Sequence, residues 1–409
     1  MDRLEVNPDK ITRADIVVGI PSYNEADSIA FVIKQVNNGL KEHFKSEDSV
    51  IINCDNDSTD DTKGAFLNTP TDVPKIYLST PPGVRGKGNN FANLFQKVAE
   101  LDAKALVVVD ADLKSITPKW IKCLGEPLLS EYGYVTPIYI RHKYDGTITN
   151  NIAYPMSRTL FGRRLRQPIG GDFGVSGEMV KCYLAQGEWP EEVKRFGIDI
   201  WMTLLAVNQG VQVCQAFMGC PKIHKAKDPA ATLGPMFKDV IGTLFHMMVK
   251  YSARWKDIVW SKPTPIFGFG LGDNDMPPPV HVDEEKLYAN FRKGFDDWAE
   301  LWESILSKDV WRKLHEVKDL SRRNFEMPDI LWANILFDFA VGYKEETFPR
   351  ERILESLIPL YFGRTRSFVR STRGMEIRQA EEFIEDQCLV FEETKSYLVE
   401  RWFGEGNGG

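Results

Sequence analysis

The sequence predicts an α/β protein with a mostly parallel sheet that is covered by helices on both faces. In the first half of the chain, four short apolar runs rich in valine and isoleucine alternate with amphipathic stretches of helical spacing. The apolar runs are nearly continuous, which is typical of strands that are buried on both sides. In a sheet of this kind, ligands bind beyond the carboxyl ends of the strands.

The four expected strands are short runs that end at a proline or at polar residues. They cover residues 15–20, 49–54, 75–78 and 105–109. A helix is expected over residues 27–40, where the apolar residues that recur on one helical face are Ile29, Val32, Ile33, Val36 and Leu40. A second helix is expected over residues 89–100, and another follows the polar turn after the second strand.

A chain of 409 residues is long enough for about two domains. Residues 261–279 are rich in proline and glycine, which indicates a linker or an ordered crossing loop. Beyond Pro279 the pattern is helical almost throughout. We therefore expect a sheet-based domain over residues 1–275 and a helical C-terminal domain over residues 276–409.

The composition argues against several classes of protein. Lys and Arg number 51 and Asp and Glu number 58, and the net charge of −7 disfavours binding to nucleic acid through phosphate neutralisation. The strongest apolar stretches, residues 105–109 and 240–249, are far shorter than the roughly 20 residues of a membrane-spanning helix. The N-terminus lacks the apolar run of a secretory signal, and the six cysteines are scattered, so we expect a cytoplasmic protein with reduced thiols.

Polar side chains follow the predicted strands, at the edge where ligands are expected. Glu25 follows the first strand, Asp55 follows the second, and Asp110 and Asp112 follow the fourth. Two carboxylates at a strand end suit a Mg²⁺ or Mn²⁺ ion that carries a diphosphate. Either aspartate could instead cap the next helix, so the spacing alone leaves both interpretations open.

The segment from Val84 to Gly88 reads Val-Arg-Gly-Lys-Gly and precedes the helix expected over residues 89–100. Glycines on both sides of Lys87 would let the backbone approach an anion at the helix N-terminus. The segment does not match the pattern of a Walker loop. A flexible loop with a solvated lysine is the alternative interpretation.

Four motifs in this order resemble the signature of the GT-A nucleotide-sugar glycosyltransferases. They are Pro21-Ser-Tyr-Asn-Glu25, Asp55-Asn-Asp-Ser-Thr-Asp-Asp-Thr62, Arg85-Gly-Lys-Gly88 and Asp110-Ala-Asp112. Further stretches are similar to the retaining glucosyl-3-phosphoglycerate synthases and the mannosylglycerate or glucosylglycerate synthases: residues 110–129, Gln167-Pro-Ile-Gly-Gly-Asp172, Phe196-Gly-Ile-Asp199 and Lys222-Ile-His224-Lys225. The resemblance implies a GT-A fold, with a Rossmann-like and mostly parallel sheet, followed by the helical domain.

The resemblance also implies a binding site for a nucleotide-sugar donor. The residues that it places at this site are Pro21, Tyr23, Glu25, Asp55, Lys87, Asp110, Ala111, Asp112, Gly170 and Gly171. The residues after the first two strands would hold the nucleobase, and Lys87 would approach the diphosphate. Asp110 would face the ribose, and the two glycines would bring the backbone close to the donor sugar.

A divalent metal ion, Mg²⁺ or Mn²⁺, is the implied cofactor. Asp112 and His224 would supply the protein ligands of the ion, since an imidazole is an acceptable ligand beside carboxylate and phosphate oxygens. Lys222 and Lys225 flank this histidine and would help to neutralise the phosphates.

The implied catalytic residues are Lys87, Asp172 and Asp199. Asp199 would lie near the anomeric carbon, Asp172 would accept hydrogen bonds from sugar hydroxyls, and Lys87 would stabilise the leaving diphosphate. The synthases usually show Gly-Glu where this chain has Gly171-Asp172, which leaves both glucose and mannose open as the transferred sugar. Helix capping is the alternative role for the two aspartates.

Two basic clusters are candidates for binding an anionic acceptor. Arg141 begins one, and Arg158 with Thr159 is the nearest match to a Gly-Arg-Val-Thr segment of the phosphoglycerate synthases. A bidentate arginine binds a carboxylate or a phosphate well. Charge clusters of this kind are more often solvated surfaces than sites.

We therefore expect a retaining transferase that moves glucose or mannose from UDP-glucose or GDP-mannose to a small anion such as glycerate or 3-phosphoglycerate, as in the synthesis of a compatible solute. The first alternative is an inverting, family 2-like GT-A enzyme that acts on a saccharide or a polyprenyl phosphate, with Asp199 or Asp172 as general base. The second alternative is a nucleotide-sugar-binding protein without catalysis. The aromatic residues of the C-terminal domain would form its core, or in part pair subunits as a homodimer.

Overall fold

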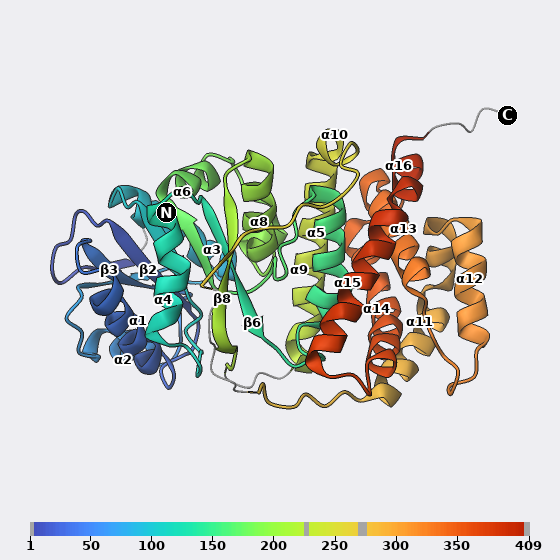
Figure 1. The fold of residues 1–409 in the computed structure, drawn as a ribbon, viewed down its shortest axis with the longest axis horizontal. Coiled ribbons are helices and arrows are strands. Elements are labelled where there is room, and N and C mark those ends of the chain that lie inside the picture. Colours follow the sequence, from blue (N-terminus) through green and yellow to red (C-terminus); the bar gives the residue numbers. More distant parts are fainter. Residues whose placement is uncertain (1–3, 225–228, 269–275, 405–409) are drawn as a thin grey trace. The chain divides into compact units, whose positions relative to one another are not determined.

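The computed structural model describes residues 4–224, 229–268 and 276–404, and these form two compact units (Figure 1). The sheet unit comprises Met1–Arg141, Leu165–Pro229 and Pro263–Pro277, and the helical unit comprises His142–Arg164, Ala230–Lys262 and Pro278–Gly409. The chain passes between the two units several times, and the expected boundary near residue 275 coincides only with the last of these points, at Pro277 and Pro278. Residues 142–164 and 230–262, which the sequence analysis assigned to the first domain, cluster with the C-terminal helices.

The sheet unit contains nine strands among its described residues, in the order β1-β4-β3-β2-β5-β7-β6-β8-β9. The strands are β1 (Leu4–Val6), β2 (Ile16–Ser22), β3 (Ser49–Asp55), β4 (Lys75–Ser79), β5 (Ala105–Val108), β6 (Tyr134–Ile140), β7 (Phe173–Ser176), β8 (Val213–Pro221) and β9 (Ile266–Phe267). Only β1 and β7 run antiparallel to their neighbours. The mostly parallel sheet is therefore confirmed, and the segment expected as a linker contributes the edge strand β9.

The helices of this unit are α1 (Ile29–His43), α2 (Thr62–Asn68), α3 (Lys87–Glu100), α4 (Pro118–Gly125), α6 (Gly177–Leu184), α7 (Glu191–Lys194) and α8 (Ile198–Gln209), with a 3₁₀ turn at Glu126–Leu129. The expected helices and strands are present, and their ends differ from the expected ones by at most three residues. The difference matters for α3, because it begins at Lys87 and thus places this lysine in its first turn.

Strand β2 shows why helices cover both faces of the sheet. Its side chains alternate, and Ile16, Val18 and Ile20 belong to a buried cluster with apolar residues of α1 and α4. On the opposite face, a Cβ on Gly19 would lie 2.4 Å from a methyl group of Leu94 in α3. Glycine at position 19 therefore lets α3 pack directly on the strand.

The strand directions bring several chain segments to one edge of the sheet. β2, β3, β4 and β5 are parallel, so their carboxyl ends lie at the same edge. β7 is antiparallel to β5 and therefore begins where the others end. β6 is antiparallel to β7 and parallel to β8, so the carboxyl end of β8 also reaches this edge.

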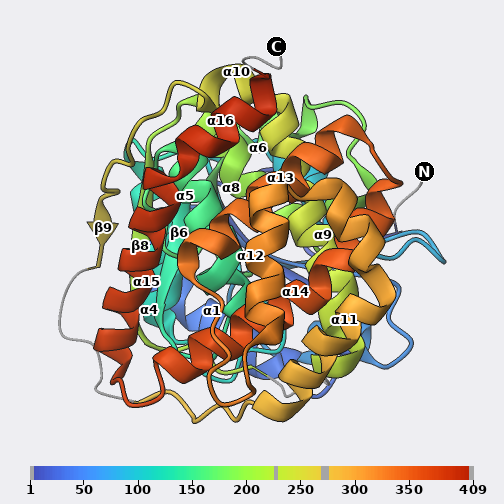
Figure 2. The ribbon, with the colours of Figure 1, turned by 90° about the vertical axis from the view of Figure 1, so that its right-hand side faces the viewer.

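The helical unit confirms the expected helical character of the C-terminal region. Its elements are a π-helical turn (Thr149–Ala153), α5 (Tyr154–Phe161), α9 (Pro229–Lys250), α10 (Ser252–Trp255), α11 (Glu284–Ile305), α12 (Lys308–Asp319), α13 (Asp329–Glu345), α14 (Arg350–Ser371), α15 (Ile377–Glu393) and α16 (Lys395–Phe403). α11 packs along α14, and α13 contacts α14, α15 and α16 (Figure 2). Trp302, Trp332, Phe337 and Phe339 are fully buried in its core. Within the described ranges, no helix is long and apolar enough to cross a membrane.

Candidate active site

A network of alternating charges occupies the edge of the sheet where the parallel strands end. Asp110 follows β5 and Lys222 follows β8, and Nζ of Lys222 lies 2.8 Å from Oδ2 of Asp110. The same ammonium group donates to the carbonyl oxygen of Gly170 at 2.7 Å and lies 2.8 Å from Oδ2 of Asp172. Burial opposes the charge of Lys222, but the two carboxylates outweigh it and raise the pKa of the lysine.

Asp172 lies directly before β7 and is completely buried. It accepts a hydrogen bond from the amide of Asp110 at 2.9 Å and a short one from the hydroxyl of Tyr139 in β6. Burial raises the pKa of Asp172, an effect that Lys222 opposes and the charge of Asp110 reinforces. The alternative role of this residue as a helix cap is wrong, because the segment that follows it is a strand.

Lys87 and Asp199 come from the first turns of α3 and α8 and form the second half of the network. Nζ of Lys87 lies 3.1 Å from Oδ1 of Asp199 and 3.5 Å from Oδ1 of Asp110. Burial would lower the pKa of Lys87, but Asp110 and Asp199 raise it, so the lysine stays charged. The side chains of Lys87 and Asp110 keep 20% and 26% of their surface exposed, which leaves them accessible to a ligand.

Gly171 joins the two halves of the network through its backbone. Its amide donates to Oδ2 of Asp199 at 3.0 Å. Its φ angle is +82°, and a Cβ at this position would lie 2.2 Å from Oδ2 of Asp110. Only glycine fits between these two aspartates without displacing them.

The glycines beside Lys87 have a different role from the expected approach to an anion. A Cβ on Gly86 would lie 2.3 Å from the carbonyl oxygen of Lys194, and one on Gly88 would lie 1.9 Å from that of Val193. The amide of Gly88 donates to the carbonyl oxygen of Arg195 at 3.1 Å. The glycines thus allow α3 to start against α7, which fixes the position of the Lys87 side chain.

The residues expected to hold the nucleobase lie at the carboxyl ends of β2 and β3 or just after them. Tyr23 is 40% exposed, and the guanidinium of Arg85 lies 5.1 Å from the centre of its ring. Pro21 and Glu25 are buried, and the carboxylate of Glu25 accepts a hydrogen bond from Ser28 at 2.8 Å. The Tyr23 ring with Arg85 therefore offers a flat surface on which a base can stack.

Asp55, which was expected near the base, is buried and serves the loop that follows it. Its carboxylate accepts hydrogen bonds from the hydroxyls of Ser22 and Tyr77 and from both the amide and the hydroxyl of Ser58, at 2.6–3.1 Å. Its exposed fraction is 2%. In this arrangement Asp55 holds the ends of β2, β3 and β4 together.

The two expected metal ligands lie in neighbouring segments. His224 forms an isolated antiparallel bridge with Leu113, the residue after Asp112, and the amide of Lys114 donates to the carbonyl oxygen of Ile223 at 2.7 Å. Asp112 is 4% exposed and His224 is exposed. In the described ranges no cluster of three or more His, Cys, Asp or Glu residues could hold a metal ion, and Lys225 lies outside them.

Comparison with known proteins identifies the segment that builds most of this network. The family model described as glycosyl transferase family 2 matches residues 17–181. Residues 17–181 form a glycosyl transferase family 2 domain. The match covers β2 to β7 and includes Lys87, Asp110 and Asp172, so the chain is a glycosyltransferase that uses a nucleotide sugar.

Two curated relatives are similar to part of this glycosyltransferase. The mannosylglycerate synthase of Rhodothermus marinus is 24% identical over 277 residues, which are 54% of this chain and 67% of that protein. The glucosyl-3-phosphoglycerate synthase of Petrotoga mobilis (strain DSM 10674 / SJ95) is 26% identical over 185 residues. That alignment covers 41% of this chain and 54% of the relative.

Similar solved structures include complexes of the glucosyl-3-phosphoglycerate synthase from Mycobacterium tuberculosis. The complex with Mn²⁺, UDP and glucosyl-3-phosphoglycerate is 22% identical, with a TM-score of 0.46 over 57% of this chain and 80% of that one. The complex with Mg²⁺ and UDP is 24% identical, with a TM-score of 0.45 over 57% and 79% of the two chains.

The basic residues expected at the acceptor site of the glycosyltransferase fall in different units. Arg141 belongs to the sheet unit, and its guanidinium lies 5.2 Å from the centre of the Tyr139 ring. Arg158 belongs to the helical unit, is 1% exposed and forms ion pairs with Glu385 and Glu392. Thr159 is buried beside it. These ion pairs account for the burial of Arg158 in the core of the helical unit. Arg141 therefore remains as the candidate for binding the acceptor.

Two residues of the network have no clear signal in the sequence. Lys222 stands out only as a neighbour of His224, and Tyr139 lies within an apolar strand without a motif of its own. Tyr139 contacts Asp172 through its hydroxyl, and Lys222 lies 5.2 Å from the centre of its ring. The order of β6 and β8 in the sheet, which the sequence pattern does not reveal, is what brings them to Asp110.

Proposed function

We propose that this glycosyltransferase is a retaining enzyme that transfers glucose or mannose from a nucleotide diphosphate sugar to a small anion such as glycerate or 3-phosphoglycerate. The observation that carries the proposal is the position of Lys87 and Lys222 at the strand ends. Asp110 contacts both lysines. Lys87 also pairs with Asp199, and Lys222 also pairs with Asp172. The names of the two curated relatives support the choice of sugar and acceptor.

The two lysines suit the leaving group of the reaction. Breaking the bond between the anomeric carbon and the diphosphate develops negative charge on the phosphate oxygens. Lys87 stays charged beside Asp110 and Asp199 and keeps part of its surface exposed. A charged donor that is already positioned stabilises the developing charge without reorganisation, which is often the largest contribution to catalysis.

Asp112 and His224 fit a divalent ion that is shared with the phosphates. A buried carboxylate and an exposed imidazole in adjacent segments offer one oxygen and one nitrogen ligand, and phosphate oxygens would complete the set. When bound, such an ion supplies further positive charge for the leaving diphosphate. Mn²⁺ suits a site with an imidazole ligand better than Mg²⁺ does.

Asp199 and Asp172 have distinct environments that suggest distinct roles. Asp199 is ion-paired with Lys87 and accepts a hydrogen bond from the amide of Gly171. A sugar that lies against this amide would therefore bring its anomeric carbon close to Asp199. Asp172 is enclosed by Lys222, Tyr139 and the Asp110 amide, and it fixes the positions of those groups. We propose that the acceptor attacks on the face of the leaving group, with a phosphate oxygen taking its proton.

Arg141 is the proposed contact for the anionic group of the acceptor. Its guanidinium packs on the ring of Tyr139, whose hydroxyl bonds to Asp172. A guanidinium in this position can bind a carboxylate in bidentate fashion. Replacing Arg141 by Gln should therefore raise KM for the acceptor and leave KM for the donor nearly unchanged.

The test is a matrix of donors and acceptors in the presence of Mn²⁺. UDP-glucose and GDP-mannose are each offered with glycerate, 3-phosphoglycerate and a neutral sugar, and the anomeric configuration of the product is read from NMR coupling constants. The proposal expects transfer to an anionic acceptor with the configuration of the donor. An inverted product, or transfer only to the neutral sugar, contradicts it and favours the inverting alternative with Asp199 as general base.

A further inference from the structure

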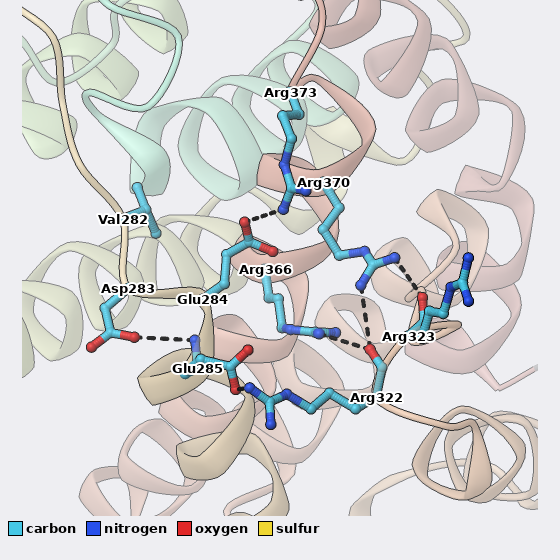
Figure 3. Close-up of a pocket in the computed structure, with 9 residues that line it drawn as sticks. All are labelled: Val282, Asp283, Glu284, Glu285, Arg322, Arg323, Arg366, Arg370 and Arg373. Carbon is cyan, nitrogen blue, oxygen red and sulfur yellow. Dashed lines mark hydrogen bonds and ion pairs between the residues drawn. The ribbon is translucent and has the colours of Figure 1, made fainter.

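A cavity of about 630 Å³ lies in the helical unit, and arginine side chains dominate its lining (Figure 3). The five arginines that line it are Arg322, Arg323, Arg366, Arg370 and Arg373. Three carboxylates, those of Asp283, Glu284 and Glu285, also line it. The lining is therefore positive by about two charges, although the whole chain has a net charge of −7. A cavity of this volume has the size of a small-molecule site.

The arginines come from two segments that converge on the cavity. Arg366 and Arg370 lie one turn apart on the same face of α14, and Arg373 follows soon after the end of this helix. Arg322 and Arg323 lie between α12 and α13. Figure 3 shows Arg366 in the middle of the group, with Arg370 and Arg373 above it and Arg322 below it. Like charges at this spacing destabilise an isolated helix, so local helix stability does not explain them.

Arg366 is buried, yet much of its hydrogen-bonding capacity is unused. It is 2% exposed and stacks between Tyr288 and Phe325, with its guanidinium 4.7 Å and 5.0 Å from the two ring centres. Its Nη2 donates to the carbonyl oxygen of Arg322 at 2.8 Å. Its Nε and Nη1 have no hydrogen-bond partner within the described parts of the chain. Burying a charged donor without an acceptor is unfavourable, so a ligand that supplies acceptors would stabilise this arrangement.

The carboxylates of the cavity are bound by groups other than Arg366 and Arg370. Glu285 pairs with Arg322 and Glu284 pairs with Arg373, while Asp283 accepts the amides at the start of α11. Within the described residues, Arg370 donates to backbone alone, to the carbonyl oxygens of Arg322 and Arg323 at 3.3 Å and 2.5 Å. Burial and the charge of Arg370 lower the pKa of Arg366, and the negative charge of Glu284 opposes them only in part. Among the described residues, Arg323, Arg366 and Arg370 thus line the cavity without an ion-pair partner.

We propose that this cavity binds the phosphate group of a small phosphate monoester, with Arg366 and Arg370 as direct ligands. Guanidinium groups bind phosphate through paired hydrogen bonds, and a monoester carries close to two negative charges, which matches the excess charge of the lining. The cavity is larger than a phosphate ion alone requires. All of its lining residues belong to the helical unit, whereas the residues proposed to contact the sugar donor and the acceptor belong to the sheet unit.

The test is calorimetric titration of the full chain at constant ionic strength with two probes, inorganic phosphate and glycerol 3-phosphate. Arg366→Met and Arg370→Gln are each expected to weaken binding at least tenfold. Arg378→Gln is the matched control, since this arginine of the same unit is 90% exposed and lies outside the cavity. Lys87→Met, which alters the proposed donor site, should leave this binding unchanged.

A second measurement locates the bound probe. Phenylglyoxal modifies accessible arginines, and mass spectrometry of the digested protein reads each one separately. Saturating probe should protect Arg323 and Arg370 and leave Arg378 as reactive as before. Binding of both probes shows that the phosphate group suffices, and binding of glycerol 3-phosphate alone shows that the organic part is also recognised. Absence of binding to either probe, or unchanged binding in Arg370→Gln, overturns the proposal even if Arg366→Met fails to fold.

Discussion

Lys222 and Asp172 form a buried ion pair at the carboxyl edge of the sheet, with Nζ 2.8 Å from Oδ2 and exposed fractions of 5% and 0% for the two side chains. Lys222 bridges Asp172 to Asp110 and to the backbone of Gly170. Because one ammonium group pairs with two carboxylates, loss of this lysine affects both the stability and the geometry of the site.

Replacing Lys222 by Met should lower the free energy of unfolding by about 3–5 kcal/mol, because it leaves the buried carboxylate of Asp172 without its ion-pair partner. Urea unfolding of the variant and the wild type measures the difference. Lys181→Met is the control, since this lysine is 47% exposed and pairs with the exposed Glu178, and its loss should cost less than about 1 kcal/mol. Equal losses in the two variants would show that Lys222 is not part of a buried network.

Replacing Lys87 by Met should reduce kcat by about a hundredfold or more, because the leaving diphosphate loses a positioned cation. The fold should persist, since Lys87 retains 20% of its side-chain surface. Steady-state kinetics and circular dichroism check the two expectations together. Lys122→Met, a change at a 45% exposed lysine of α4, should leave kcat within twofold of the wild type. A Lys87→Met enzyme with normal kcat would remove the lysine from the reaction.

Replacing Gly171 by Ala should impair transfer more than it destabilises the fold. The left-handed backbone costs an alanine about 1–2 kcal/mol, and the new Cβ would also push Asp110 away from Lys222. Gly187→Ala is the matched control, because Gly187 has a φ of +73° and nothing within 4 Å of its Cβ. Gly171→Ala should lose at least as much stability as Gly187→Ala in thermal melts, and only Gly171→Ala should lose activity. Equal activity in the two would show that the close approach is not needed.

Lys395 makes the stability of the helical unit depend on pH. Burial lowers its pKa to about 8, from an ordinary value of 10.5, and its ammonium group donates to the carbonyl oxygens of Trp255 and Ile258. Between about pH 8 and pH 10.5 the unfolded chain binds this proton and the folded chain does not, so stability from this group rises with pH. Relative to Lys395→Met, the wild type should therefore gain stability across this window in urea unfolding. A constant difference would mean that the burial of Lys395 has no effect on its ionisation.

The helices and strands that have a clear hydrophobic periodicity were predictable from the sequence. The residues that come directly after such a strand were predictable as well. The strand before Asp110 and the helix beside Lys87 are local patterns. Asp110 follows its strand as expected, whereas Lys87 lies in the first turn of α3 and not in a loop before it. The pairing of Lys222 with Asp172 was not predictable, because it depends on the antiparallel insertion of β7 between β5 and β6.

The role of Arg158 shows a second limit of the sequence pattern. Its place in a basic cluster favoured a surface or an acceptor site, but the segment from 142 to 164 clusters with the C-terminal helices. Its partners Glu385 and Glu392 lie more than two hundred residues away along the chain. When the carboxylates that pair with an arginine lie so far away along the chain, the residues next to the arginine give no sign of the ion pair.

The most direct test of the proposed site is the turnover of Asp112→Ala with a nucleotide sugar, an anionic acceptor and Mn²⁺. Asp112 follows β5 beside Asp110, and its carboxylate is the proposed protein oxygen ligand of the ion. The site at the strand ends predicts that this variant keeps the circular dichroism spectrum of the wild type and has no detectable transfer. A folded Asp112→Ala protein that transfers sugar at the wild-type rate would contradict it.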